Sequence, residues 1–334
     1  MPGKWDPTPI RAIRVVPRTA AYGYRSFDRQ FVVADPRFLD RASAAWRIDG
    51  PQQVYLTTLT STKLGRGPAA TATPYVPDLD HFRGSYGAKN VIPLWRDSAG
   101  KAPNVTAGLA EALDEELGFA PTPEDLLSYV YGLAGTAAFT ERFAAELDVA
   151  AGPFRVPITT DPALFRDVAA LGRELLWWHT WGERFAPPGK TNLPPGGATQ
   201  LAPVHGYPDS FSYHAETQEL VVGTGRFGPV SPEVWRFEVS GLRVLMSWLG
   251  YRMATKKGKR SSPLDEIRGE RWSFATELLE LIAVLQHTVD TTERAAQLLD
   301  RVVESRLVDP TSLPVPTEAE RKAPGPGGAG TLLA

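Results

Sequence analysis

The residues of this chain that suggest chemistry are cations, and they gather in one stretch. From Arg236 to Arg271 there are nine Lys or Arg against four Asp or Glu, an excess of five positive charges in a chain whose formal net charge is −2. The most closely spaced of these cations are Arg252, Lys256, Lys257, Lys259 and Arg260. Ammonium and guanidinium groups donate hydrogen bonds to phosphate oxygens, so this spacing predicts a surface that faces a polyanion. A solvated run of charge is the alternative.

Two motifs that would support cofactor binding fail on their surroundings. Gly223 to Gly228 matches the dinucleotide pattern G-x-G-x-x-G, but Pro229 and Pro232 follow where that site needs a helix N-terminus. A turn between two strands is the better interpretation. Gly189-Lys190-Thr191 resembles the end of a phosphate-binding loop, but Arg184 occupies the position of that motif's first glycine. A surface loop is therefore expected there.

Side chains that commonly bind metals or act as nucleophiles form no pattern either. The sequence has no cysteine, and its five histidines lack the i, i+4 pairing or the carboxylate neighbours of a metal site. The Gly-x-Ser-x-Gly nucleophile elbow is missing as well. We expect no catalytic residue, no metal and no cofactor, and a chain that binds its ligand without converting it.

The composition is that of a globular protein. The 334 residues are 43% hydrophobic and 22% charged, enough for one large domain or two ordinary ones. No stretch approaches the roughly 18 apolar residues that cross a bilayer, and the N-terminus lacks the apolar core of a signal peptide. With the absence of cysteine, these features predict a cytoplasmic protein without a membrane partner.

Sequence periodicity separates β-favouring from helical segments. The expected strands are 13–16, 31–33, 54–59 and 91–94 in the front, and 211–213, 219–222 and 234–239 later. Helices are expected to begin at Thr122-Pro123 and Asp161-Pro162, because a capping side chain followed by proline is typical of a helix start. Further helices are expected from Leu242 and over about 273–306.

These elements predict an α+β architecture. The predicted parts are a β-rich target-recognition part (1–103), a helical part (104–185), a Pro/Gly-rich loop (186–209), a strand-and-helix part (210–308) and a disordered tail (309–334). The sheet of the β-rich half is expected to be mixed or antiparallel, with the late strands returning to it. The tryptophan cluster Trp177, Trp178 and Trp181 is expected either in the core or in a patch where a partner docks.

Several segments, taken in order and spacing, resemble one family. In the front these are Tyr24-Arg25-Ser26-Phe27-Asp28-Arg29-Gln30, Pro77-Asp78-Leu79, 81–88 and Asn90-Val91-Ile92-Pro93-Leu94-Trp95. Later ones are 129–135, 139–143, 155–158, 234–237, 240–245, Trp248-Leu249 and Pro263-Leu264. This collinear set, over about residues 10 to 305, resembles the C-terminal specificity domain of type ISP restriction-modification enzymes. Ser26 departs from the family, which has proline there.

The resemblance implies sequence-specific recognition of double-stranded DNA in a restriction-modification system. Family members carry nuclease, helicase-like and adenine methyltransferase modules ahead of this domain. This chain shows none of them, so we expect a methyltransferase or restriction subunit as its partner. The alternative is a scaffold that kept the fold, docks on a methyltransferase or another partner and does not bind DNA. The slightly acidic net charge favours that alternative.

Under the same resemblance, polar residues of projecting front loops are candidates for contacts with base edges. Arginine can bond guanine in bidentate fashion, whereas phosphate contacts supply affinity. The base-readout candidates are Thr62, Lys63, Arg66, Arg83, Lys89, Asn90 and Arg96, and the five cations from Arg252 to Arg260 are the phosphate candidates. The segment from Tyr24 to Arg29 is expected to form a structural corner in which Asp28 pairs with an arginine.

Overall fold

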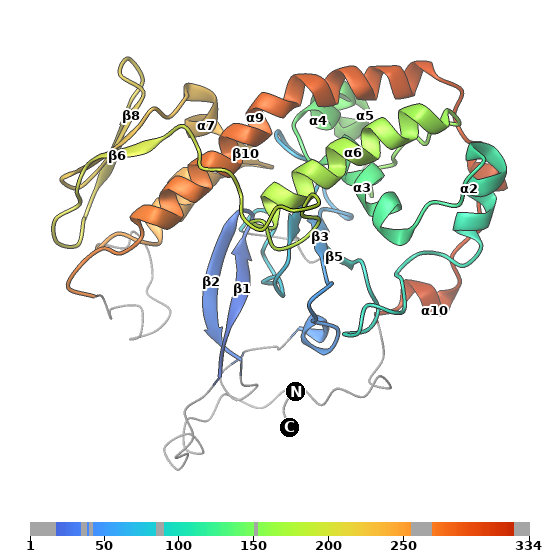
Figure 1. Ribbon diagram of the computed structural model, residues 1–334, viewed down its shortest axis with the longest axis horizontal. Coiled ribbons are helices and arrows are strands. Elements are labelled where there is room, and N and C mark those ends of the chain that lie inside the picture. Colours follow the sequence, from blue (N-terminus) through green and yellow to red (C-terminus); the bar gives the residue numbers. More distant parts are fainter. Residues whose placement is uncertain are drawn as a thin grey trace, which may run out of the picture.

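The fold combines small antiparallel sheets with long helices, in a computed structural model that describes residues 18–34, 39, 43–84, 90–149, 153–254 and 269–323 (Figure 1). The strands are β1 (Thr19–Arg25), β2 (Asp28–Val33), β3 (Tyr55–Thr58), β4 (Thr71–Thr73), β5 (Asn90–Pro93), β6 (Thr199–Ala202), β7 (Phe211–His214), β8 (Glu219–Val222), β9 (Gly225–Gly228), β10 (Glu238–Val239) and β11 (Leu242–Arg243). The α-helices are α2 (Leu109–Leu117), α3 (Pro123–Ala134), α4 (Ala138–Arg142), α5 (Ala144–Val149), α6 (Pro162–His179), α7 (Pro232–Arg236), α8 (Val244–Gly250), α9 (Ala275–Glu304) and α10 (Glu318–Arg321). The predicted α+β class is confirmed. None of the described helices is both long and apolar enough to cross a membrane.

Two central helices begin where the local sequence predicts. The Thr122 hydroxyl accepts a hydrogen bond from the backbone N–H of Asp125, and the Asp125 carboxylate accepts one from the N–H of Thr122, which makes a reciprocal capping box at the start of α3. At the start of α6 the Asp161 carboxylate accepts from the N–H groups of Ala163 and Leu164. These caps satisfy backbone donors that would otherwise be left without a partner.

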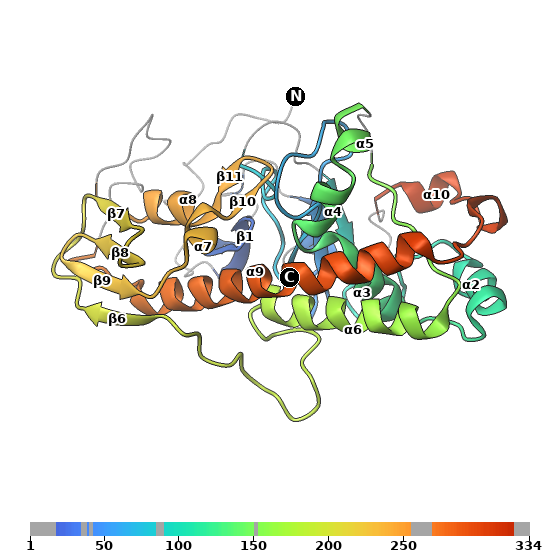
Figure 2. The same ribbon diagram turned by 90° about the horizontal axis from the view of Figure 1, so that it is seen from above.

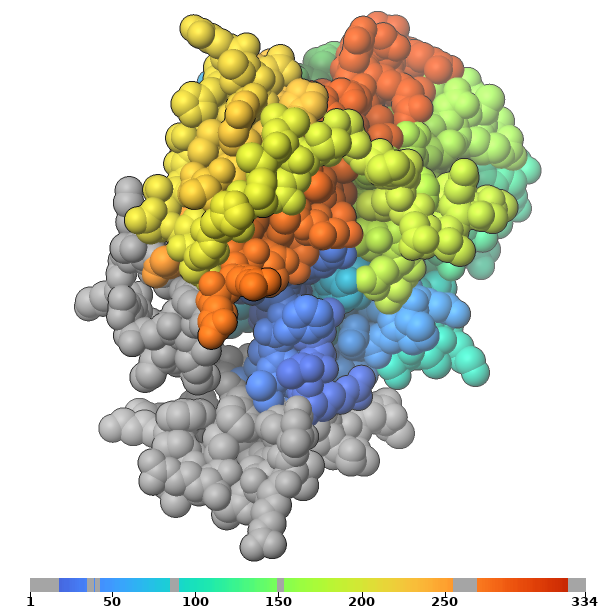
Figure 3. All heavy atoms as spheres, turned by 60° about the vertical axis from the view of Figure 1, so that its left-hand side comes forward, coloured from blue at the N-terminus to red at the C-terminus, as the bar shows by residue number. Residues whose placement is uncertain are grey.

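The long helix α9 connects two hydrophobic cores (Figure 2). Its N-terminal half, with Leu281 and Leu285, packs into a core shared with the β6–β9 sheet and α8. Its C-terminal half, with Leu298 and Val302, packs into a second core formed with α3, α4, α6 and the β3–β5 sheet. Figure 3 shows the N-terminal turns of α9 in orange between the yellow β6–β9 sheet and the blue β1–β2 hairpin. The helix therefore fixes the two halves relative to each other.

The tryptophan cluster belongs to this buried scaffold. Trp177 and Trp178, at the end of α6, are each 7% exposed and pack in the α9 N-terminal core. Trp181 is partly buried and lies beneath the guanidinium of Arg29, which is 4.4 Å from its ring centre. Of the two alternatives left open for this cluster, the core position is the one observed.

The late strands do not join the front sheet. β3 lies between β4 and β5, whereas β6, β9, β8 and β7 form a separate four-stranded antiparallel sheet, and β10 pairs with β11 alone. The prediction that they return to the front sheet is therefore wrong for the described residues. The predicted 186–209 loop also contains β6. The interpretation of Gly223 to Gly228 is confirmed, since Gly223 and Thr224 turn between β8 and β9.

The predicted strand at 234–239 is largely a helix. The Ser231 hydroxyl accepts a hydrogen bond from the N–H of Val234, and Pro232 occupies the first turn of α7. Within this range only Glu238 and Val239 form a strand. The β-branched residues favoured a strand, but the cap and the proline before them are helix-start signals that outweigh this propensity.

Two buried histidines predict a pH-dependent stability. His179 lies between Tyr131 and Thr288, whose oxygens are 2.6 and 2.8 Å from Nδ1 and Nε2. The Thr288 hydroxyl donates to the backbone oxygen of Val284, so it is free only to accept from Nε2–H, and Nδ1 must accept from the Tyr131 hydroxyl. Burial lowers the pKa of His179 to about 3, and likewise that of His81.

Because the unfolded histidines titrate near 6.5, the unfolded chain binds more protons between pH 6.5 and 3. The free energy of unfolding should therefore fall as pH decreases in this range, by about 2 kcal/mol per histidine between pH 7 and 5. Urea unfolding at these pH values measures it. In His179→Gln the free energy of unfolding should fall by about 2 kcal/mol less than in the wild type between pH 7 and 5. If the two curves of unfolding free energy against pH are parallel, the lowered pKa of His179 is contradicted.

Candidate nucleic-acid interface

The corner at the β1–β2 turn is built around a buried ion pair. Arg252 Nη2 and Nη1 lie 2.7 and 3.3 Å from the two carboxylate oxygens of Asp28, and both side chains are only 3% exposed. The guanidinium also stacks 3.8 Å from the ring centre of Trp248. Burial raises the pKa of the Asp28 carboxyl, against the lowering effect of Arg252. The predicted pairing of Asp28 with an arginine is confirmed.

This position corrects one phosphate candidate. A phosphate contact needs an exposed guanidinium, and that of Arg252 is enclosed by Asp28, Trp248 and Phe274. Its charge is also neutralised by the buried carboxylate. We therefore replace the phosphate role predicted for Arg252 with a structural one. The other four phosphate candidates, Lys256, Lys257, Lys259 and Arg260, and the base-readout candidate Lys89 lie outside the described residues.

The loop from Thr60 to Arg66 projects from the end of β3 and is fixed at several points. At its start, the Asn90 side-chain oxygen accepts from the N–H of Thr60 at 3.3 Å. In its middle, Leu64 packs against both hydrophobic cores. At its end, the Ser240 hydroxyl accepts from the N–H of Gly65 at 2.8 Å. The fold thus brings two predicted candidates, Asn90 and Arg66, to opposite ends of one anchored loop.

The three candidates within this loop differ in their surroundings. Lys63 is 56% exposed and forms an exposed ion pair with Asp148, with 3.0 Å between Nζ and Oδ1. Arg66 is exposed, and its guanidinium makes no ion pair within the described part of the chain. Thr62 is half-buried, and its hydroxyl has no hydrogen-bond partner among the described residues. Arg66 is therefore the cation of this loop best placed to meet a ligand.

The β10–β11 hairpin lies beside this loop, and two further arginines lie in it or just before it. Arg236 at the end of α7 is exposed and forms an exposed pair with Glu233, whose oxygen is 3.4 Å away. Arg243 in β11 is half-buried, and its Nε has no hydrogen-bond partner among the described residues. On the other side of the hairpin, a Cβ at Gly84 would lie 3.6 Å from Leu242, which places the turn carrying Arg83 next to β11.

These residues define what we call the hairpin surface: Lys63, Arg66, Arg83, Arg236 and Arg243. Figure 2 shows β10, β11 and α5 on the side of the molecule away from α6. Arg236 and Arg243 fall within the basic span recognised in the sequence, but they stand apart from its densest run. A search by local charge density therefore missed them.

Arg96 does not belong to this surface, because it holds the C-terminal segment. Its guanidinium donates to the backbone oxygens of Glu320 and Lys322 at 3.0 and 2.9 Å, and to the side-chain oxygen of Asn104 at 3.0 Å. The Glu320 carboxylate in turn accepts from the N–H of Ala107 at 2.8 Å. This corrects the base-readout prediction for Arg96. It also corrects the disordered-tail prediction as far as residue 323, because these polar contacts and the packing of Leu313 on the hydrophobic core hold the segment.

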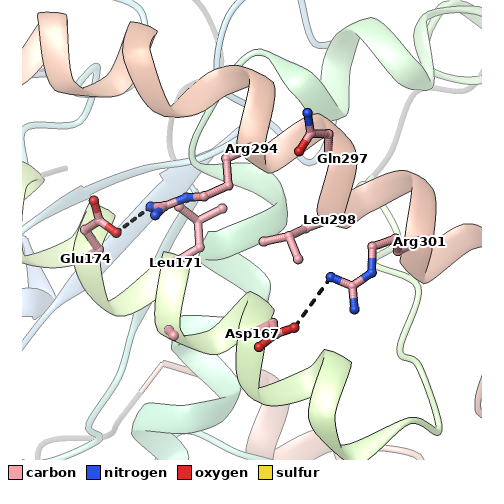
Figure 4. A pocket seen from close by; sticks show the side chains of 8 residues that line it. Asp167, Leu171, Glu174, Arg294, Gln297, Leu298 and Arg301 are labelled. Carbon is pink, nitrogen blue, oxygen red and sulfur yellow. Dashed lines mark hydrogen bonds and ion pairs between the residues drawn. The ribbon is translucent and has the colours of Figure 1, made fainter.

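A cavity between two long helices has no catalytic character. It measures about 370 Å³ and lies between α6 and α9, where Glu174 pairs with Arg294 and Asp167 with Arg301 (Figure 4). The two arginines are thus neutralised by the two carboxylates, which leaves no net charge to attract an anion. Within the described ranges, no group of three or more His, Asp or Glu side chains could hold a metal ion.

No curated protein matches this sequence. Solved structures share the fold, among them three DNA complexes. The first is a nuclease-deletion mutant of the type ISP restriction-modification enzyme LlaGI in complex with a DNA substrate mimic, with 15% identity and a TM-score of 0.54 over 83% of this chain and 21% of that chain. The second is a DrdV–DNA complex, with 16% identity and a TM-score of 0.57 over 86% of this chain and 28% of that chain. The third is the ATP-dependent type ISP restriction-modification enzyme LlaBIII bound to DNA, with 15% identity and a TM-score of 0.57 over 87% of this chain and 19% of that chain. The chain thus spans less than a third of the length of each.

The family comparison covers most of the chain. The model of the type ISP C-terminal specificity domain matches residues 10–283. This range includes the β1–β2 corner, the Thr60–Arg66 loop, the β10–β11 hairpin and the first turns of α9. The chain therefore belongs to the family of type ISP C-terminal specificity domains.

Proposed function

We propose that this chain recognises a specific sequence in double-stranded DNA, as the specificity module of a restriction-modification enzyme. The observation that carries the proposal is the family membership over residues 10–283, together with three structural neighbours that are DNA complexes. The hairpin surface supports it, because it places exposed arginine on an anchored loop. The chain has no catalytic role in this proposal, and an adenine methyltransferase or restriction subunit supplies the chemistry.

The hairpin surface can serve both parts of DNA binding. Cations at its rim, such as Lys63 and Arg236, are exposed, and their pairs with surface carboxylates are weak enough to exchange for phosphate. Arg66 has the fork of donors that matches guanine O6 and N7 in the major groove. Phosphate contacts would supply affinity and this arginine discrimination. Thr62, Arg83 and Asn90 remain base-readout candidates, and each is half-buried.

The first experiment is binding of the purified chain to random-sequence duplex DNA over a salt series. Affinity should fall steeply as salt rises, with a slope of about −0.9 per phosphate contact. Rounds of selection should then enrich one sequence. If the chain retains no duplex at about 50 mM salt, where non-specific contacts are strong, DNA recognition by this chain is contradicted and the docking role is favoured.

Replacement of Arg66 tests the base contact. Arg66→Ala should reduce the ratio of specific to non-specific affinity by about 5- to 150-fold, the range for one lost bidentate base contact, and leave the salt slope nearly unchanged. Arg306→Ala is the matched control, since Arg306 is 82% exposed and lies beyond the far end of α9. Equal weakening on all sequences, with the slope reduced by about one contact, would instead make Arg66 a phosphate contact.

A further inference from the structure

The turn between β10 and β11 carries an unusual residue. Val239 pairs with Leu242, so Ser240 and Gly241 are the two central residues of the turn, with φ values of +49° and +93°. Two positive φ values define a type I′ turn, which favours Asn or Gly at both positions. Serine carries a Cβ that disfavours this left-handed conformation. The fold nevertheless places serine there, and its contacts indicate what it contributes.

Ser240 contacts two consecutive residues of the Thr60–Arg66 loop. Its hydroxyl accepts from the N–H of Gly65 at 2.8 Å, and its own N–H donates to the backbone oxygen of Arg66 at 2.7 Å. Ser240 is itself buried, at 8% exposure, and Gly65 lies at the surface, so the bond from Gly65 is part-buried. The approach is close, because a Cβ at Gly65 would lie 3.0 Å from the Ser240 Cα. The turn therefore holds the backbone on both sides of the Arg66 Cα.

The next residue of the loop is held as firmly. A Cβ at Gly67 would lie 1.8 Å from the backbone oxygen of Glu238, so β10 packs directly on the chain at this point. The Thr140 hydroxyl donates to the backbone oxygen of Gly67 at 2.6 Å. Arg66 thus has a fixed backbone and an exposed side chain, in contrast to a cation on a freely moving loop.

We propose that Ser240 is a positioning residue for base readout, which acts by holding Arg66 in one backbone geometry. The inference rests on the proposed DNA recognition and names its chemistry: a guanine edge in the major groove. A bidentate contact requires the guanidinium plane to align with O6 and N7, so orienting Arg66 before binding lowers the entropy cost of that contact. A phosphate contact, being less demanding in direction, would gain far less.

Two substitutions separate the hydroxyl from the turn geometry. Ser240→Gly removes the hydroxyl and relieves the positive φ, so its thermal midpoint should stay close to that of the wild type. Ser240→Ala removes the hydroxyl and keeps the unfavourable φ, so its midpoint should fall. Both variants should lose about three- to tenfold in the ratio of specific to non-specific affinity, the range for re-ordering one long side chain on binding. Neither should change the salt slope.

Two further measurements trace the effect to the loop. The amide of Gly65 should exchange hydrogen faster in both variants than in the wild type, because it loses its acceptor. In the Arg66→Ala background, Ser240→Gly should cause no further loss of discrimination, since residues that act through one contact are not additive. The inference is supported if discrimination falls alike in both variants despite their different midpoints.

The outcomes that overturn it are distinct from failure of the proposed function. Unchanged exchange of the Gly65 amide, or unchanged discrimination in variants that bind DNA, overturns the role of Ser240 and leaves DNA recognition standing. An additive loss in the Arg66→Ala background does the same. A wild-type chain that binds no duplex overturns the proposed function, and the positioning role with it.

Discussion

Replacement of Arg252 by methionine should lower the free energy of unfolding by about 3–5 kcal/mol, the range for breaking a buried ion pair. The substitution leaves the Asp28 carboxylate 3% exposed without its bidentate partner. It also removes the hydrogen bond to the backbone oxygen of Trp248 and the stacking on the Trp248 ring. Urea unfolding at pH 7 measures the loss. Near-neutral stability would show that the carboxylate finds other partners or takes up a proton.

A double variant separates the pair from its parts. Arg252→Met combined with Asp28→Leu should be more stable than Arg252→Met alone, because no unpaired buried charge remains. Because Arg252 is buried, its replacement should also leave the number of phosphate contacts unchanged. At a temperature where Arg252→Met is folded, the salt slope for DNA should equal that of the wild type. A slope reduced by about one contact would restore the phosphate role that the sequence predicted for Arg252.

Arg252 shows why local charge misled the sequence analysis. Its near neighbours in sequence are Lys256 and Lys257, so it looks like the first cation of a basic loop. Its partner Asp28 lies 224 residues away, and nothing in the local pattern reveals that pairing. The sequence analysis did predict that Asp28 pairs with an arginine, but not which one. Arg96 is similar, since the backbone oxygens that it binds are on a segment more than 220 residues later.

Most features determined by neighbouring residues were predicted well; α7 is the exception, because its local cap and proline were outweighed in the prediction by strand-favouring residues. The starts of α3 and α6, and the turn at Gly223 and Thr224, depend on side chains within a few positions along the chain. The pairing of strands depends instead on which apolar faces meet. The β6–β9 sheet buries Leu220, Val222 and Phe227 against α8 and α9 and so needs no edge of the front sheet. The alternation of apolar residues gives each strand but not its partner.

The candidate site was predicted only in part, because the sequence shows local features and not the contacts between distant residues. Composition identified the Thr60–Arg66 loop as polar and projecting, and Arg66 is indeed exposed there. The contacts that anchor the loop come from Ser240, Thr140 and Asn90, which are distant in sequence. Ser240 has no signal of its own beyond its place before Gly241. Its positive φ appears only once β10 and β11 are paired.

The crossing of α3 and α6 leads to the second large effect, since both helices carry glycine where they meet. A Cβ at Gly172 would lie 1.7 Å from the backbone oxygen of Ser128 and 2.8 Å from the nitrogen of Gly132. Because these are backbone atoms, Gly172→Ala must push the two helices apart. We expect a loss of about 3 kcal/mol in the free energy of unfolding, the upper range for overpacking.

Gly250→Ala is the matched control. Gly250 lies at the end of α8, no atom lies within 4 Å of a Cβ built there, and the substitution should be neutral or slightly stabilising. Equal urea midpoints for the two variants would contradict close backbone contact at this crossing. A large loss confined to Gly172→Ala would show that the packing of α3 on α6 depends on contact between main chains, which no residue larger than glycine permits.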